Sequence, residues 1–260
     1  MQYEAFAITD AGTVRTHNED CVVLGRDFIT DGELARRLDE PFLAAVCDGV
    51  GGIRSGEVAA RLCAGMLAER AFSDPDELSD RIAAIHRAIR AYGQVHEECR
   101  DMQTTLCCLA ADAAGRAYCF NCGDSRLFLH RGGKTAQVSV DHTLAQHLFD
   151  AGQIDARGLA HHPDSHVITA ALGIAAENPS VDIIPIGGRL GECADEALIL
   201  CSDGISDFVG ADEIEICLSL DADFKAKIEA LFDLALEKGT ADNLSIIGIR
   251  PVYPDAAEFQ

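Results

Sequence analysis

The chain has 260 residues, and its 43 Asp and Glu against 21 Lys and Arg give a formal net charge of −22. That sign excludes a protein that grips nucleic-acid phosphates through clustered Lys and Arg, and it argues against docking on an anionic membrane. Because 48% of the residues are hydrophobic, the composition is that of a folded protein rather than a disordered one. No apolar run approaches the ~20 residues of a membrane span and no signal peptide is visible, so we expect a cytoplasmic protein without membrane insertion.

The first half of the chain predicts strands followed by two helices. Short apolar segments indicate strands, and apolar residues at three- and four-residue steps indicate helices. The polar segment 26–40 reads as an insertion with a helix in ELARRLDE, and its Asp31-Gly32 pair reads as a turn. The predicted strands cover residues 3–9, 21–25 and 42–47, and the predicted helices cover 57–71 and 77–100.

The second half predicts a series of antiparallel strands and then a return to helices. The segments TTLCCLAAD, AYCFNC, RLFLHR and AQVSV are short and separated by turn residues. A helix over 144–151 follows, and then a polar, His-rich loop over about 152–168. Strands at 181–186, 197–201 and 244–249 enclose helices that begin near residues 211 and 223. This order is not a regular alternation of strand and helix, so it favours one α+β domain over 1–260 with helices outside antiparallel sheets.

The eleven cysteines mostly lie inside apolar runs, as in FLAAVC and ALILC. Cysteine packs as a small buried hydrophobe, and an odd number without a secretion signal argues against a disulfide framework. Cys119 and Cys122 form one CxxC, whereas a structural zinc site usually needs a second such pair or two histidines. We therefore expect buried thiols in strands.

Acidic residues stand at the ends of several predicted strands. Asp48-Gly49 follows FLAAVC, Asp203-Gly204 follows ALILCS, and Asp242 precedes the last strand. A glycine beside a carboxylate lets the backbone carbonyl approach an ion. Each Asp taken alone is better explained as the end of its own strand, but together they predict a cluster at one rim. The other acidic positions of this kind are Glu19, Asp20 and Asp124.

Such a cluster repels itself unless cations neutralise it, and Mg²⁺ and Mn²⁺ prefer carboxylate, carbonyl and water ligands. Two such ions activate water and hold oxygens during displacement at phosphorus. A phosphoryl substrate also favours an arginine, whose planar fork matches phosphate oxygens. Arg15 stands four residues before Glu19, and spacing alone leaves open whether it is a phosphate ligand or a surface residue.

An ordered series of motifs across almost the whole chain resembles the metal-dependent Ser/Thr protein phosphatases of type 2C, the PPM family, in its compact bacterial branch. The motifs are GTVRTHNEDC, AAVCDGVGG, TTLCCL, NCGDSRLFL, VDHTLAQ, HVITAALG, LILCSDGISD and TADNLSII. The resemblance implies a sandwich of two antiparallel β-sheets flanked by α-helices (αββα), with two Mn²⁺ or Mg²⁺ ions at one rim. It also implies hydrolysis of phosphoserine and phosphothreonine by a hydroxide that bridges the ions, without a covalent intermediate. Phosphorylated proteins would be the substrates, and a Ser/Thr kinase system the counterpart.

By the same resemblance, Asp48 bridges both ions, the Gly49 carbonyl binds one, and Asp203 and Asp242 hold the other. Glu19 and Asp20 act mostly through bound waters, and Asp124 with Asp203 supports a weaker third ion. Arg15 orients the phosphate.

The chain departs from the family pattern at two positions. Val50 stands where animal-type enzymes have a histidine proposed as general acid, and Ala170 replaces an arginine in the usual ITRALG. The loop 152–168 corresponds to the mobile flap. Its residues His161, His162 and His166 read as solvated loop histidines, with metal ligation as the alternative.

Two rival functions stay open on the sequence. One is a catalytically inactive relative that binds phosphoproteins, and the other is a metal-dependent hydrolase of small phosphoesters. The presence of Asp48, Asp203 and Asp242 disfavours the first. The substrate protein, the physiological metal, the oligomeric state and the general acid are not predicted.

Overall fold

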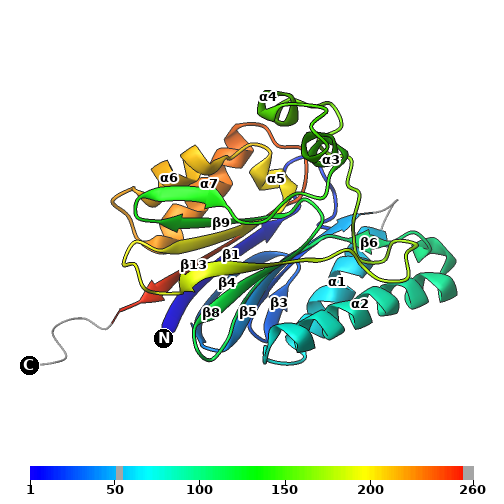
Figure 1. Cartoon of the computed structure of the whole chain (residues 1–260), viewed down its shortest axis with the longest axis horizontal. Helices are drawn as coiled ribbons and strands as arrows, with labels where there is room; N and C mark the ends of the chain where they lie inside the picture. Colours follow the sequence, from blue (N-terminus) through cyan, green and yellow to red (C-terminus); the bar gives the residue numbers. More distant parts are fainter. Residues whose placement is uncertain (51–54, 254–260) are drawn as a thin grey trace, which may run out of the picture.

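The computed structural model describes residues 1–50 and 55–253. Its centre is a pair of stacked antiparallel sheets with helices on both outer faces, which is the predicted αββα sandwich (Figure 1). Within the described residues, no helix combines the length and apolar character needed to cross a membrane.

The first sheet has six strands in the order β10-β9-β12-β13-β1-β4. All of its pairings are antiparallel, and β1 pairs with β13 over its whole length, from Gln2 opposite Val252 to Asp10 opposite Leu244. The strands are β1 (Gln2–Asp10), β4 (Gly32–Asp39), β9 (Arg126–Arg131), β10 (Lys134–Gln137), β12 (Ala197–Cys201) and β13 (Leu244–Val252).

The second sheet has seven strands in the order β11-β8-β7-β5-β2-β3, with β6 paired to the end of β5. Asp20 at the start of β2 lies opposite Asp48 near the end of β5. The strands are β2 (Asp20–Leu24), β3 (Asp27–Ile29), β5 (Phe42–Val50), β6 (Gln103–Thr104), β7 (Leu106–Ala111), β8 (Arg116–Cys122) and β11 (Asp182–Arg189).

The helices divide between the two outer faces. In Figure 1, α1 and α2 lie against the second sheet, α6 and α7 lie against the first, and α3 and α4 stand above the sandwich. Asp74 caps α2 by accepting a hydrogen bond from the Glu77 N–H, as the sequence SDPDE predicts. The helices are α1 (Ser55–Ala68), α2 (Pro75–Val95), the 3₁₀ turn η1 (Glu97–Cys99), α3 (Leu144–Asp150), α4 (Ala156–Ala160), α5 (Asp203–Ser206), α6 (Ala211–Leu218) and α7 (Phe224–Glu237).

Alternating side chains of the central strands fill three apolar layers. In β5, Leu43 and Ala45 pack under α1 and α2, whereas Ala44 and Val46 face the other sheet. This explains why the run FLAAVC is wholly apolar, because the strand is buried on both faces. Ten of the eleven cysteines are buried and all eleven are free thiols, as expected; Cys193 is half-buried.

The helix predicted in residues 33–40 is wrong, because this segment is the edge strand β4. Leu34 and Leu38 are its buried side chains. A spacing of four places two residues on one face of a helix, but it also places them on one face of a strand. Pairing with β1 from Gly32 to Asp39 decides between the two. The Asp31-Gly32 turn was predicted correctly and connects β3 to β4, with Gly32 at a φ of 85°.

Candidate metal and phosphate site

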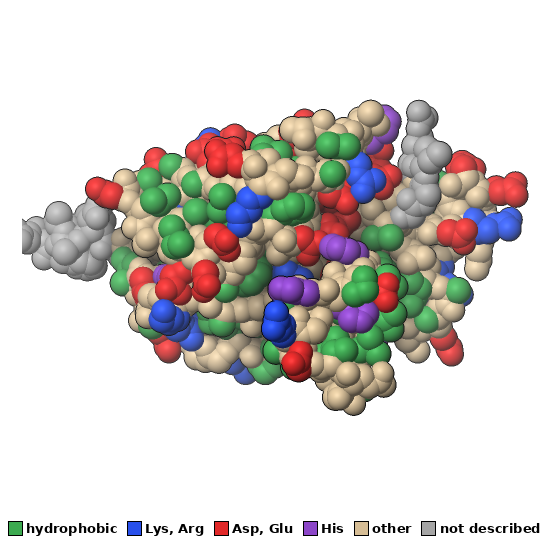
Figure 2. Space-filling view, turned by 90° about the horizontal axis from the view of Figure 1, so that it is seen from above, with side chains coloured by type: hydrophobic (Ala, Val, Ile, Leu, Met, Phe, Trp, Pro, Cys, Tyr) green, Lys and Arg blue, Asp and Glu red, His purple; other side chains and the backbone are tan. Residues whose placement is uncertain are grey.

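A pocket of about 250 Å³ opens at the rim where strands of both sheets end. The second sheet contributes Asp48 and Gly49 from the end of β5, and the turn after β8 contributes Asp124. The first sheet contributes Asp203, directly after β12, and Asp242, just before β13. Figure 2 views the molecule from the side of α3 and α4, and it shows red carboxylate side chains gathered in a hollow on this face.

The predicted site residues therefore come together in space, with one difference in depth. Seven of the eight line the pocket: Arg15, Glu19, Asp48, Gly49, Asp124, Asp203 and Asp242. Asp20 lies behind them and is only 1% exposed. Its Oδ2 accepts a hydrogen bond from the Ser202 hydroxyl at 2.8 Å, while its Oδ1 is buried without a partner.

Burial and mutual repulsion raise the pKa of the carboxyl groups in the cluster. Burial is the main cause for each. The pKa is about 7 for Asp20, about 8 for Asp124 and about 6 for Asp203, and charges of neighbouring aspartates add to all three. The pKa of Asp48 lies well above its ordinary value, because burial is joined by the charges of Asp20, Asp203 and Asp124. The positive charge near the cluster is therefore too small to balance its negative charge.

Divalent cations bound by oxygen ligands would supply the missing positive charge. The unpartnered Oδ1 of Asp20 and the raised pKa values are what a carboxylate cluster shows without its counter-charge. The donor set consists of carboxylate and carbonyl oxygens, which suit Mg²⁺ and Mn²⁺. Within residues 1–50 and 55–253, no three His, Cys, Asp or Glu side chains already stand close enough together to form a complete metal-binding set.

Gly49 is required where the backbone of β5 crosses the start of α1. A Cβ atom on Gly49 would lie 2.4 Å from the Gly56 carbonyl carbon and 2.6 Å from the Glu19 carbonyl oxygen. Its N–H donates to that same Glu19 oxygen at 3.1 Å. The glycine therefore allows the end of β5, the start of α1 and the residue before β2 to approach one another closely beside the pocket.

Arg15 reaches the pocket from the loop between β1 and β2. Its Nη2 lies 2.8 Å from Asp242 Oδ2, and both side chains are partly exposed. The charge of Asp242 raises the pKa of the guanidinium. Arg15 is thus a permanently charged donor that lines the pocket and pairs with a rim carboxylate.

Several uncharged side chains that fix the rim received no role from sequence reasoning. Thr105 Oγ1 accepts the Asp48 N–H at 3.1 Å and lies 2.7 Å from the Ser125 hydroxyl, and the Thr104 hydroxyl donates to the Asp48 carbonyl at 3.0 Å. The motif TTLCCL was the available signal, since two adjacent hydroxyl residues before an apolar strand are typical of local backbone hydrogen bonds.

Asn243 fixes the loop that carries Arg15. Its Oδ1 accepts the Glu19 N–H at 2.9 Å, and its Nδ2 donates to the carbonyls of Ala11 at 3.1 Å and His17 at 2.9 Å. The adjacent residues Asp242 and Asn243 thus have different roles, because Asp242 lines the pocket and Asn243 binds the loop between β1 and β2.

Of the three loop histidines, only His166 lines this pocket. Its Nδ1 lies 3.0 Å from Asp207 Oδ2. His161 is exposed, and His162 Nδ1 accepts the Asp164 N–H at 3.1 Å within its own loop. Val50 also lines the pocket, whereas Ala170 is buried in the core beneath α1 and α2.

Comparison with known proteins identifies the family. A model of the family described as Protein phosphatase 2C matches residues 26–246. The chain belongs to the protein phosphatase 2C family. The predicted fold, the predicted family and the predicted enzyme class, a serine/threonine protein phosphatase, are therefore confirmed.

Several similar proteins come from bacteria. The chain is 27% identical over 248 residues to the serine/threonine phosphatase Stp of Listeria welshimeri, covering 92% of each chain. It is 32% identical over 259 residues to the serine/threonine protein phosphatase PstP of Mycobacterium tuberculosis, covering 98% of this chain and 46% of that one. The crystal structure of the Mycobacterium tuberculosis phosphatase PstP superposes with a TM-score of 0.82 at 29% identity, over 97% of this chain and 100% of that chain. A structure of the PstP catalytic domain in complex with two manganese ions has a TM-score of 0.77 at 30% identity, over 97% and 100% of the two chains.

Proposed function

We propose that this protein phosphatase 2C member hydrolyses phosphoserine and phosphothreonine in phosphorylated proteins with two Mn²⁺ or Mg²⁺ ions at the rim. The observation that carries the proposal is the buried carboxylate cluster with raised pKa values beside the permanently charged Arg15. We assign this chemistry to one catalytic domain over 1–260. The manganese in the related PstP structure supports the choice of ion.

We assign the ions to the same residues that the family resemblance indicated. Asp48 and the Gly49 carbonyl would hold one ion, and Asp48, Asp203 and Asp242 the other. Glu19 and Asp20 would act through water, and Asp124 with Asp203 would support a third, weaker ion. When bound, such ions activate a water molecule for direct attack at phosphorus and neutralise charge on the phosphate.

The chain's own residues bind and orient the substrate. Arg15 is partly exposed, so its fork can leave Asp242 and bind two phosphate oxygens. Thr104, Thr105 and Asn243 hold the backbone of the rim through hydrogen bonds of 2.9–3.1 Å, so the carboxylates keep their positions as charge accumulates. The Ser202 hydroxyl donates a hydrogen bond of 2.8 Å to Asp20 Oδ2 and holds this carboxylate in place.

A Ser/Thr kinase system is the proposed source of the substrates, because such kinases make the phosphoester bonds that this site would cleave. We propose the cytoplasm as the compartment, since eleven free thiols persist best where disulfides are kept reduced.

The test is phosphate release from a phosphothreonine peptide at increasing Mn²⁺, with Asp203→Asn as the site variant and Asp233→Asn, exposed on α7, as the control. We expect saturable Mn²⁺ dependence, no activity in excess chelator, and a loss of at least ~100-fold in kcat/KM for Asp203→Asn alone. Nucleotides tested in parallel should be poor substrates. Full activity in excess chelator would refute the metal assignment.

A further inference from the structure

Cleavage of a phosphorylated serine or threonine needs a proton as well as a nucleophile. The side-chain oxygen leaves as an alkoxide, which is a strong base and therefore a poor leaving group unless a general acid protonates it. A positioned side chain that supplies this proton typically contributes about 10²–10⁴-fold to the rate. The carboxylates of the rim are assigned to cations and are therefore not available as the general acid.

Among the described residues that line the pocket, His166 is the one side chain outside the proposed metal ligands whose chemistry suits general acid catalysis. Arg15 is a poor proton donor, because the charge of Asp242 raises its pKa further. Val50 has no ionisable group, and neither has Asn243. Residues 51–54, which lie outside the described residues, read GGIR and contain no carboxyl or imidazole group.

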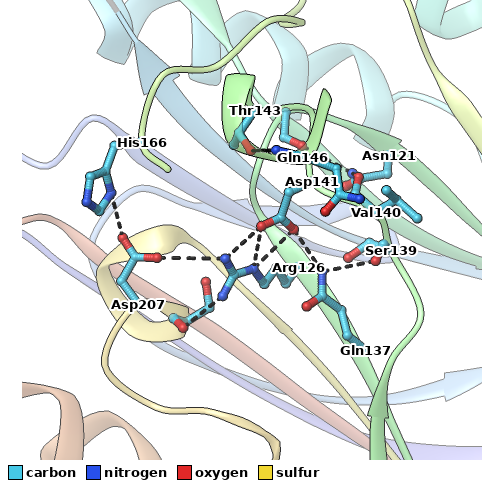
Figure 3. A network of polar contacts seen from close by, with 12 residues as sticks. Asn121, Arg126, Gln137, Ser139, Val140, Asp141, Thr143, Gln146, His166 and Asp207 are labelled. Atoms are coloured by element: carbon cyan, nitrogen blue, oxygen red, sulfur yellow. Dashed lines mark hydrogen bonds and ion pairs between the residues drawn. The ribbon is translucent and has the colours of Figure 1, made fainter. Parts of the chain in front are cut away.

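The ring of His166 is oriented by the carboxylate of Asp207. His166 comes from the 152–168 loop, and its Nδ1 lies 3.0 Å from Asp207 Oδ2 (Figure 3). With Nδ1–H donating to Asp207, the second ring nitrogen, Nε2, is the one available to a substrate. A carboxylate in this position fixes the orientation of the ring.

Asp207 is in turn fixed to the catalytic rim. It follows α5, and its N–H donates to the Asp203 carbonyl at 3.0 Å, so it stands one helical turn from a proposed metal ligand. Arg126 lies 3.8 Å from Asp207 Oδ1, and its guanidinium donates to Asp141 Oδ2 at 2.6 Å and to the Ser206 carbonyl at 2.9 Å. Figure 3 shows the chain of contacts from His166 through Asp207 and Arg126 to Asp141.

The same chain lines a second, larger cavity of about 650 Å³ beside the catalytic pocket, and His166 borders both. The side chain of His166 is 66% exposed, so a substrate in the catalytic pocket can reach it. Asp207 is less exposed, at 26% of its side chain. The histidine is thus accessible while its partner is held in place.

We propose that His166 is the catalytic residue that protonates the leaving oxygen of the serine or threonine, and that Asp207 is its positioning residue. As the bond between phosphorus and the side-chain oxygen breaks, its electron pair stays on that oxygen, which takes the proton from Nε2. The imidazole left behind regains a proton from solvent. This inference rests on the proposed phosphatase function.

The test compares two substrates whose leaving groups differ in their need for a proton. His166→Gln should lower kcat on a phosphothreonine peptide by about 10²–10⁴-fold. On p-nitrophenyl phosphate, whose phenolate leaves without a proton, the loss should be far smaller. Asp207→Asn should show the same selectivity with a smaller loss. The control is His162→Gln, in the same loop but away from the pocket, which should leave both rates unchanged.

A second measurement separates proton donation from metal binding. Mn²⁺ titrated calorimetrically into the wild type and into His166→Gln should give the same affinity and stoichiometry. Equal losses on both substrates, weaker Mn²⁺ binding, or an undiminished rate on the phosphopeptide would each overturn the assignment. If the wild type hydrolyses neither substrate with Mn²⁺, the phosphatase function itself fails, and the role of His166 fails with it.

Discussion

Replacing Asp203 by asparagine should stabilise the metal-free protein near neutral pH while removing its activity. Burial and the charges of Asp242 and Asp207 raise the pKa of Asp203 from 3.8 to about 6. One pKa unit corresponds to about 1.4 kcal/mol, so ionised Asp203 costs the folded state about 3 kcal/mol above pH 6. This is an upper bound, because Asp203 keeps part of its surface in solvent. Asparagine carries no charge and avoids this cost.

The sign of the pH dependence follows from the raised pKa. The folded state holds the Asp203 proton to a higher pH than the unfolded state does, so wild-type stability falls as the pH rises from about 4 to about 6. The advantage of Asp203→Asn should therefore be near zero at pH 4 and full at pH 7.5. For a chain of this size, about 3 kcal/mol corresponds to roughly 6–12 °C in Tm.

Thermal unfolding in excess chelator at both pH values measures this difference, with Asp233→Asn on the exposed face of α7 as the control. Added Mn²⁺ should reverse the order, because an ion at 1,000 times its Kd stabilises the wild type by about 4.1 kcal/mol, which exceeds the variant's advantage of about 3 kcal/mol. A variant less stable than the wild type at pH 7.5 in chelator, or equally shifted at both pH values, would show that the cluster is not self-repelling.

Further predictions concern the backbone of the rim. Thr105→Val removes two buried hydrogen bonds, one of them to Asp48, and should lower the free energy of unfolding by about 2–4 kcal/mol and weaken Mn²⁺ binding; chemical denaturation and calorimetry would measure both. Gly204→Ala would place its Cβ 1.9 Å from the Asn243 carbonyl oxygen and should abolish Mn²⁺ binding or folding. Gly65→Ala on α1, where no atom lies within 4 Å, should instead stabilise the protein by about 0.5–1 kcal/mol. A tolerated Gly204→Ala with normal Mn²⁺ affinity would contradict the close approach of these segments.

The sequence predicted the strands and the acidic rim because both depend on local patterns. A strand buried on both faces reads as an unbroken apolar run, and a carboxylate next to glycine at its end is visible without any structure. Asp48 and Asp203 were predicted as neighbours in space for this reason, and they line one pocket. Their roles as metal ligands stay predictions.

Local sequence patterns did not predict the contacts between segments that are distant in the chain. The strand β4 was predicted as a helix because Leu34 and Leu38 suit either structure, and only the pairing with β1 distinguishes them. His166 is the first residue of the motif HVITAALG, but the motif did not show that His166 alone of the three loop histidines borders the pocket. Asp207 ends the motif LILCSDGISD but received no role from the sequence, since its role follows from the 3.0 Å contact with His166.

Both sheets contribute carboxylates to the rim. The apolar layer between the sheets therefore separates the two groups of carboxylates. Asp20 and Asp48 stand at strand ends of the second sheet, while Asp203 and Asp242 stand at strand ends of the first. Apolar side chains of this layer such as Val46 and Ile247 therefore set the distance between the two halves of the cluster. Because packed interiors respond even to the loss of one methylene group, a substitution in this layer should change metal affinity before it unfolds the protein.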